Sequence, residues 1–138
     1  MNRIASGPSV GDVMTPGPVT VRADAPLMDA ARLLEEHEIS GVPVVDRDGA
    51  LVGVLAESDL VRARATEHLW SRWPGLQVRH LMHAPALTAD AMMSLEEAAT
   101  LMERAHVHRL IVIGDDQRTP IGIVSTSDIV RAIVGERA

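Results

Sequence analysis

The sequence predicts an α+β fold made from two copies of a strand, helix, strand, strand, helix unit. Three observations predict it: the chain aligns with itself, each copy alternates between helical and extended periods, and its strands are apolar at consecutive positions. The chain has 138 residues, of which 46% are hydrophobic and 23% are charged, a composition typical of one compact globular protein. We therefore expect one domain built from two repeats.

The repeat is found by shifting the chain by 68 positions against itself. The matched pairs include Val10 with Val78, Met14 with Met82, Thr20 with Thr88, Leu27 with Leu95 and Val44 with Val112. One extra residue then raises the offset to 69, which aligns Gly53, Ser58 and Asp59 with Gly122, Ser127 and Asp128. The sequence predicts a first repeat over residues 8–65, a linker segment over 66–77 and a second repeat over 78–135, which together form one intramolecular pair.

The elements of the first repeat follow from its periodicity. Residues 18–21 form a short extended piece, and the apolar positions that follow Pro26 have helical spacing, which predicts a helix of roughly three turns. Two apolar runs, 42–45 and 51–55, flank a turn in which a glycine takes the left-handed position, and Pro43 is expected at the start of its strand. A second helix is expected over residues 57–65.

The second repeat predicts the same order of elements. They are a strand at 86–89, a helix at 94–105, strands at 109–113 and 120–124, and a helix at 126–134. Strands that are apolar at consecutive positions need both sheet faces covered, but helices cover only one face, and a unit of about 55 residues buries little surface alone. We therefore expect the two sheets to pack face to face about a pseudo-twofold axis, with symmetry-related clefts along the seam.

The segment between the repeats carries two tryptophans. Leu69, Trp70 and Trp73 have helical spacing, and Trp73-Pro74-Gly75 ends the segment. One interpretation is a linker helix that packs Trp70 and Trp73 on the domain or on a partner subunit. The other is an exposed docking patch, and the sequence does not separate the two.

Composition excludes several functional classes. The absence of cysteine excludes disulfides, thiolate zinc sites and a cysteine nucleophile, and thirteen cations against nineteen acids give a net charge of −6, which argues against a nucleic-acid partner. No apolar run is long enough for a membrane span and no secretory segment precedes residue 10, so we expect no membrane partner and a cytoplasmic location.

Catalysis and metal binding are not expected either. The chain has no phosphate-binding glycine loop with a lysine, no nucleophile elbow and no zinc-protease helix, so we expect no enzyme activity and no required cofactor. His80 and His83 lie three apart on a predicted short helix, and His106 and His108 lie two apart before a strand. Without cysteine or a nearby acidic pair, we expect no metal site.

The strongest local motif runs from a glycine to an aspartate in each repeat, from Gly53 to Asp59 and from Gly122 to Asp128. A serine followed three residues later by an acid, at a turn from strand to helix, is typical of helix capping. The first copy has lost the capping hydroxyl at Ala56 but keeps Asp59, which favours ligand contact as the reason for the aspartate. A carboxylate there could accept two hydrogen bonds from a ribose diol, although capping alone remains the alternative.

The duplicated pattern resembles the CBS-domain pair, or Bateman module, over roughly residues 8–135. The resemblance lies in Val13-Met14-Thr15, Leu81-Met82, the segments 39–46 and 107–112, and both glycine-to-aspartate motifs. It implies a stand-alone pair that binds AMP, ADP, ATP, S-adenosylmethionine or another adenosyl compound as a regulatory ligand. It also implies a homodimer formed through helices.

The resemblance implies two unequal nucleotide clefts, each drawing residues from both repeats. One would place Ser58 and Asp59 at the ribose and His108 and Arg109 toward phosphate, without a hydroxyl at Ala56. The other would place Ser125, Ser127 and Asp128 at the ribose, with Ser40 and Gly41 at the positions that match the basic pair, so this cleft would lack a cation. The remaining positions implied to lie near ligand are Thr20 and Thr88, with the adenine flanked by Ile39, Val42, Val107 and Leu110. Ile111 replaces the proline that matches Pro43, and we expect a looser strand entrance there.

These observations favour a regulatory module that senses adenosyl nucleotides and shifts the geometry of its own dimer or of an unidentified effector protein. The alternative is a constitutive oligomerisation or protein-interaction module that binds no ligand. The interaction module is favoured if no adenosyl compound binds.

Overall fold

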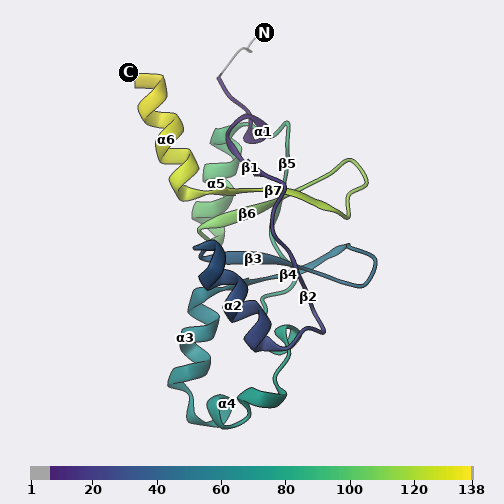
Figure 1. Ribbon diagram of the computed structural model, residues 1–138. Helices are drawn as coiled ribbons and strands as arrows, with labels where there is room; N and C mark the ends of the chain where they lie inside the picture. The colour runs from purple at the N-terminus through teal and green to yellow at the C-terminus, as the bar shows by residue number, and fades with distance from the viewer. Residues whose placement is uncertain (1–6, 138) are drawn as a thin grey trace. The chain divides into compact units, whose positions relative to one another are not determined.

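The chain divides into two compact units, and the computed structural model describes residues 7–137. The first-repeat unit is Val19–Ala86, and the second-repeat unit joins the residues up to Pro18 with those from Leu87 onward (Figure 1). Each unit contains one sheet and its own helices, so the predicted α+β fold with tandem repeats is confirmed.

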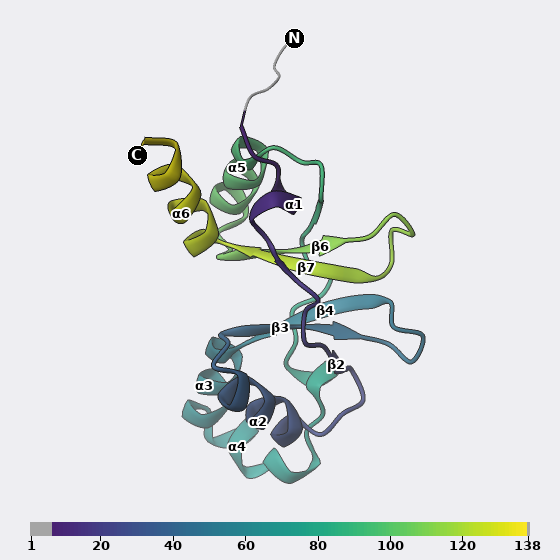
Figure 2. The ribbon, with the colours of Figure 1, turned by 45° about the horizontal axis from the view of Figure 1, so that its top comes forward.

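The first-repeat unit is built on a three-stranded sheet of order β2-β3-β4. Its strands are β2 (Val21–Arg22), β3 (Gly41–Val45) and β4 (Leu51–Ala56), and its helices are α2 (Leu27–His37), α3 (Glu57–Ala65) and α4 (Glu67–Ser71). The central strand β3 runs parallel to β2 and antiparallel to β4. Helices α2 and α3 lie on the same side of this sheet (Figure 2).

The second-repeat unit is built on a four-stranded sheet of order β1-β7-β6-β5. Its strands are β1 (Thr15–Pro16), β5 (Thr88–Asp90), β6 (Arg109–Ile113) and β7 (Pro120–Ser125), and its helices are α1 (Val10–Val13), α5 (Leu95–Ala105) and α6 (Thr126–Arg137). Helix α6 continues three residues beyond the predicted end at residue 134. Strands β5 and β6 are parallel, whereas β6 and β7 form the predicted hairpin.

A short segment crosses each hairpin in the same way. In the second-repeat unit Val10 donates its N–H to the Met93 carbonyl (2.8 Å), and Thr15 pairs with Ile123. In the first-repeat unit Val78 donates to the Ala25 carbonyl (2.9 Å), and His83 pairs with Val54. Residues 9–16 therefore pack with the later part of the chain, and residues 77–83 pack with the earlier part. The limits of the sequence repeats, 8–65 and 78–135, stay a prediction.

The two cores use equivalent positions of the repeat. Buried residues of the first core include Ala30, Leu34, Val42, Val44 and Leu55, and those of the second include Ala98, Met102, Leu110, Val112 and Val124. Each large aliphatic side chain buried in this way stabilises its unit by about 1.5–3 kcal/mol. All five residues of β3 are buried, in agreement with its run of consecutive apolar residues.

Two predictions about strand entrances were wrong. Pro43 is the third residue of β3 rather than its first, and it is tolerated because Val54, its partner in β4, bonds through both its N–H and its C=O to His83. Ile111 does not loosen β6: it is 1% exposed, and its N–H donates to the Leu87 carbonyl (3.1 Å), a bond that a proline could not make.

The tryptophan segment is two short helices instead of one. Helix α4 ends at Ser71, and a 3₁₀-helix, η1 (Trp73–Gly75), follows. Trp73 packs against the first core, whereas Trp70 is 41% exposed and lies under the Arg64 guanidinium, 4.5 Å from the ring centroid. The segment thus combines features of both interpretations, a packed tryptophan and an exposed one.

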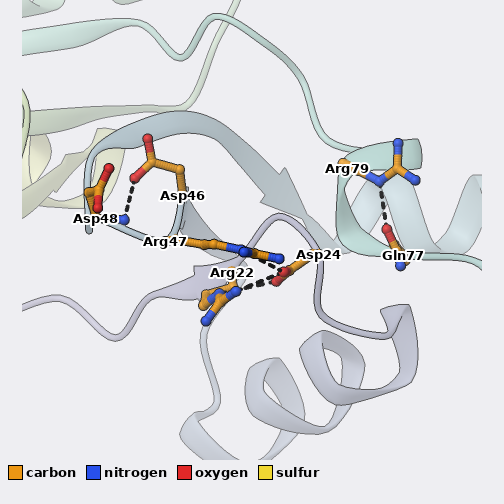
Figure 3. Close-up of polar contacts among 7 residues, drawn as sticks. All are labelled: Arg22, Asp24, Asp46, Arg47, Asp48, Gln77 and Arg79. Carbon is orange, nitrogen blue, oxygen red and sulfur yellow. Dashed lines mark hydrogen bonds and ion pairs between the residues drawn. The ribbon is translucent and has the colours of Figure 1, made fainter.

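Polar contacts stabilise the turn end of the first hairpin, away from the α3 end (Figure 3). Asp46 accepts from the N–H groups of Asp48 and Ala50, and Gly49 takes the predicted positive φ of 85°. Arg22 and Arg47 both approach Asp24, and the hydrogen bond from Arg22 lowers the pKa of Asp24 below its ordinary value.

Among the described residues, no helix is long and apolar enough to cross a membrane.

Candidate functional site

In each unit, several of the predicted ligand residues lie at one corner, where the hairpin meets the following helix. In the first-repeat unit, Gly41 pairs with Ala56, and the Glu57 N–H donates to the Ser40 carbonyl (2.9 Å). Helix α3 begins there, with Ser58 exposed and Asp59 buried. The chain therefore brings Ser40 and Gly41 beside the turn that carries Asp59.

Asp59 is fully buried, with 0% exposure, and its carboxylate accepts three hydrogen bonds. Oδ2 accepts the Ala56 backbone N–H (2.8 Å), and Oδ1 accepts from Arg62 Nη2 (2.9 Å) and from His83 Nε2 (2.8 Å). A buried carboxylate needs such donors, because burying an unpaired charge is costly. Asp59 is therefore a satisfied charge at the start of α3.

The second-repeat unit has the equivalent corner. Arg109 pairs with Ser125, and the Thr126 N–H donates to the His108 carbonyl (3.0 Å), which reproduces the Glu57–Ser40 bond. Among these residues His108 and Ser127 are exposed, whereas Arg109 and Ser125 are half-buried. The basic pair of the sequence motif thus lies within the same unit as Ser125, Ser127 and Asp128.

Asp128 is 7% exposed and also accepts three hydrogen bonds. Oδ2 accepts the Ser125 N–H (2.8 Å) and the Ser125 hydroxyl (3.1 Å), and Oδ1 accepts from Arg131 Nη1 (2.9 Å). The two aspartates share the backbone donor and the arginine, but they differ in the third donor.

Capping explains more of the motif than the sequence suggests. The absent hydroxyl at Ala56 does not remove the cap, because the Asp59 carboxylate still accepts the Ala56 N–H, and this half of a capping box needs no hydroxyl. Retention of the aspartate in both repeats is therefore compatible with capping. A ligand role for Asp59 and Asp128 must use whatever acceptor capacity the caps leave.

Three neighbours of these carboxylates were missed by sequence reasoning. Arg62 and Arg131 follow their aspartates by three residues on a helix, a spacing at which side chains meet, so this pairing was detectable. His83 is 24 residues from Asp59, and no local pattern could have connected them. Only the crossing of residues 77–83 over the hairpin places that imidazole on the carboxylate.

The other predicted ligand residues differ in exposure. Thr20 is exposed and Thr88 is half-buried at the start of β5. Ile39 and Val107 are half-buried against their cores, whereas Val42 and Leu110 are 0% exposed core residues. Ile39 and Val107 therefore keep exposed surface for an apolar contact, while Val42 and Leu110 serve the cores.

The histidine pairs do not converge on a cation site. The predicted short helix is a 3₁₀-helix, η2 (Val78–His80), that ends before His83, and His80 Nδ1 accepts the Gln77 N–H (2.9 Å). Within residues 7–137, no group of three histidine or acidic side chains is placed to hold a metal ion.

A shallow groove lies between α5 and α6 in the second-repeat unit. It has a volume of ≈ 550 Å³, and its lining includes Met102, His106, His108, Thr126, Ile129 and Val130. Asp128 does not line it, but Val107, His108 and Thr126 do, so this groove adjoins the corner that carries Asp128.

A family model described as the CBS domain matches residues 10–66 and 78–135, which is most of the chain. The chain belongs to the CBS domain family. Its two repeats are therefore CBS repeats, as the sequence resemblance predicted. The matched ranges leave out much of the tryptophan segment, which has no counterpart within the other repeat.

Solved structures of CBS pairs resemble this one over nearly its whole length. CBSX2 of Arabidopsis thaliana, solved in complex with AMP, is 34% identical, covers 96% of this chain and 100% of its own, and has a TM-score of 0.82. The CBS domain pair of protein MJ0100, solved with 5'-methylthioadenosine and S-adenosyl-L-methionine, is 27% identical, covers 93% of this chain and 97% of its own, and has a TM-score of 0.82.

Curated relatives are of two kinds. YhcV of Bacillus subtilis, a CBS domain-containing protein, is 31% identical over 88% of this chain and 82% of its own length. The L-aspartate semialdehyde sulfurtransferase of Methanocaldococcus jannaschii is 28% identical over 93% of this chain, but the match spans only 24% of that protein. CBS pairs thus occur both as most of a protein and as a small part of an enzyme.

Proposed function

We propose that this CBS pair is a regulatory module that binds an adenosine-containing small molecule and acts through binding rather than catalysis. The observation that supports it most is the pair of equivalent corners, each with a carboxylate on the first turn of a helix, in a chain similar to pairs solved with AMP and with S-adenosyl-L-methionine. In this proposal no cofactor is required, and the nucleotide is a regulatory ligand.

The proposed ligand contacts combine the corner residues with the predicted partners. Asp59 and Asp128 would accept from ribose hydroxyls, His108 and Arg109 would lie toward phosphate, and Arg109 would supply positive charge there. The assignment of these groups to two unequal clefts stays a prediction. Regulation follows from linkage, because a ligand shifts a conformational equilibrium only when it binds one state more tightly.

Isothermal titration calorimetry with AMP, ADP, ATP and S-adenosylmethionine tests this proposal, with GMP as the control for the base. We expect saturable heat with at least one adenosyl compound and little with GMP. A ligand at about 100 times its Kd should raise the free energy of unfolding by about 2.7 kcal/mol, measurable as a thermal shift.

A matched variant shows whether the carboxylates take part. Asp59→Asn together with Asp128→Asn should weaken binding, whereas Glu57→Gln, an exposed acid on the first turn of α3, should not. If none of the four compounds gives heat or a thermal shift, the result favours the constitutive interaction module instead.

We further propose that the module forms a homodimer through α6. Its side chains Val130, Ile133 and Val134 are 59%, 50% and 62% exposed at helical i, i+3, i+4 spacing, and Val130 also lines the α5–α6 groove. In the first repeat, Arg64 and Ala65 take the places of Ile133 and Val134, and Arg64 contacts Trp70 of the same unit. A second copy of this chain is the partner that the sequence resemblance implies for the uncovered face.

A further inference from the structure

The two CBS repeats satisfy their buried aspartates with different third donors. In the second repeat, that donor is the Ser125 hydroxyl, which belongs to the same turn as Asp128. In the first repeat, residue 56 is alanine, and the His83 imidazole donates to Asp59 in its place. The position equivalent to His83 is Thr15, which crosses its hairpin in the same register. The first repeat therefore has alanine at position 56 and histidine at position 83, and the equivalent positions of the second repeat hold Ser125 and Thr15.

These donors limit what each carboxylate can still accept. An ionised carboxylate has about four acceptor positions, two on each oxygen. Oδ1 of Asp59 is filled by Arg62 and His83, and Oδ2 has one position left beside the Ala56 N–H. By this count, a single additional donor needs no present hydrogen bond to break, but it reaches the carboxylate only when the side chains that cover it move, because Asp59 is 0% exposed. A ribose diol that donates both hydroxyls needs a second position, so a donor now on Asp59 must leave.

His83 is the donor whose departure disturbs least. The Ala56 N–H is part of the backbone at the end of β4, and the Arg62 guanidinium, with permanent charge and several N–H groups, attracts the carboxylate even when one bond lengthens. The His83 side chain is 63% exposed, so water can replace its partner. Its backbone is held separately by two bonds to Val54 (2.9 and 3.0 Å), so the ring can turn without displacing the segment.

We infer that His83 competes with ligand hydroxyls for Oδ1 of Asp59, so that the first repeat discriminates against a vicinal diol unless the imidazole is displaced. This inference rests on the proposed function, since it takes Asp59 as the ribose acceptor. The second repeat has no such competitor in the described contacts of Asp128, because the Ser125 hydroxyl can rotate and itself bond to the incoming hydroxyl.

The test compares AMP with 2'-deoxy-AMP by calorimetry on the full chain. AMP presents a vicinal diol, whereas 2'-deoxy-AMP presents one hydroxyl, which fits the remaining position on Oδ2. His83→Ala should tighten AMP binding at the first-repeat site by about 3- to 10-fold and change 2'-deoxy-AMP binding less than twofold, since one hydrogen bond is at stake. His80→Ala is the matched control, because its ring bonds to the Gln77 N–H.

Two further variants separate competition from a general structural effect. His83→Gln keeps an amide donor and should remain close to the wild type. Ala56→Ser combined with His83→Thr transfers the second repeat's arrangement to the first, and it should also tighten AMP binding. This pair restores a third donor to Asp59, so it keeps the test valid where His83→Ala lowers the melting temperature of the unliganded protein.

The outcomes distinguish this inference from the proposed function. Unchanged or weaker AMP binding by His83→Ala, with AMP still bound by the wild type, overturns the competition alone. An equal gain for AMP and 2'-deoxy-AMP also overturns it, since the diol would then play no part. If neither the wild type nor any variant binds AMP, the result overturns the inference together with an AMP-binding function.

Discussion

Asp59 and Asp128 each combine a structural and a proposed functional task in one side chain. Each carboxylate accepts the N–H of the residue before its helix and an arginine one turn further along. Removing the acceptor leaves the part-buried backbone N–H of Ala56 or Ser125 without its partner, and an unsatisfied donor typically costs about 1–3 kcal/mol of stability. An isosteric amide is therefore a better probe of binding than alanine, since it keeps one oxygen as acceptor.

Asp59→Asn and Asp128→Asn should weaken adenine-nucleotide binding by unequal factors. The third donor on Asp59 is an imidazole, whereas Asp128 carries a rotatable hydroxyl, and the family resemblance predicts a basic pair in only one cleft. Calorimetric titration of the two single variants with AMP measures the difference. Equal losses would contradict unequal clefts.

A second residue-scale prediction concerns Asp116, in the turn before β7. The Thr119 hydroxyl, followed by the N–H groups of Thr119 and Arg118, lowers the pKa of Asp116 from 3.8 to about 2. A lowered pKa in the folded state stabilises the protein above about pH 4, and this contribution is lost as the pH falls toward 2. Thr119→Val should raise the pKa of Asp116, as followed by NMR titration of the carboxyl carbon.

The control for that titration is Thr119→Ser, which keeps the hydroxyl and should leave the pKa near 2. If the valine variant titrates like the wild type, the hydroxyl is not the main cause of the low pKa.

At the scale of elements, the crossing segment requires a glycine in each hairpin. A Cβ placed on Gly53 would lie 2.7 Å from the His83 carbonyl oxygen, and one on Gly122 would lie 3.1 Å from the Thr15 carbonyl oxygen. Contacts as short as the first do not occur for real Cβ atoms, so the backbone must shift. The glycine that opens the motif thus lets the segment carrying His83 approach β4.

Gly53→Ala should lower the free energy of unfolding by about 1–3 kcal/mol, the usual cost of overpacking a tight contact. Urea unfolding measures it through the transition midpoint. Gly75→Ala is the control, because a Cβ at Gly75 meets nothing within 4 Å. Equal effects of the two substitutions would show that close approach is not the reason for Gly53.

Elements were largely predictable because their periods are local. The helices beginning at Leu27 and Leu95 carry apolar stripes, and the hairpin turn ends in a glycine with positive φ, so each was found from neighbouring residues. Strand β1 and helix α1 were not, since a two-residue strand and a one-turn helix have no period of their own. They form because residues 9–16 bond to β7 and to the turn at Ala91 and Met93.

At the scale of the whole molecule, α6 offers the uncovered apolar face. Its exposed stripe of Val130, Ile133 and Val134 is of the kind that marks interaction surfaces when contiguous. If a second copy covers it, a charge placed in the stripe must be buried without a partner, which strongly opposes association.

Ile133→Glu with Val134→Glu should therefore convert the proposed dimer into a monomer, as measured by size-exclusion chromatography with light scattering. Met92→Glu, at an 82% exposed position of a turn, should leave the mass unchanged. A wild-type protein that is monomeric across the concentration range would contradict dimerisation through α6.

The sequence by itself determined the duplication, the order of elements, the family and the two aspartates, because each depends on residue types at fixed spacing along the chain. The tertiary structure decided what surrounds those aspartates. Asp59 meets His83 from 24 residues away, and Val42 is a fully buried core residue. The reason is physical: a hydrogen bond between distant segments depends on which segment crosses which hairpin, and that crossing leaves no periodic signal in the sequence.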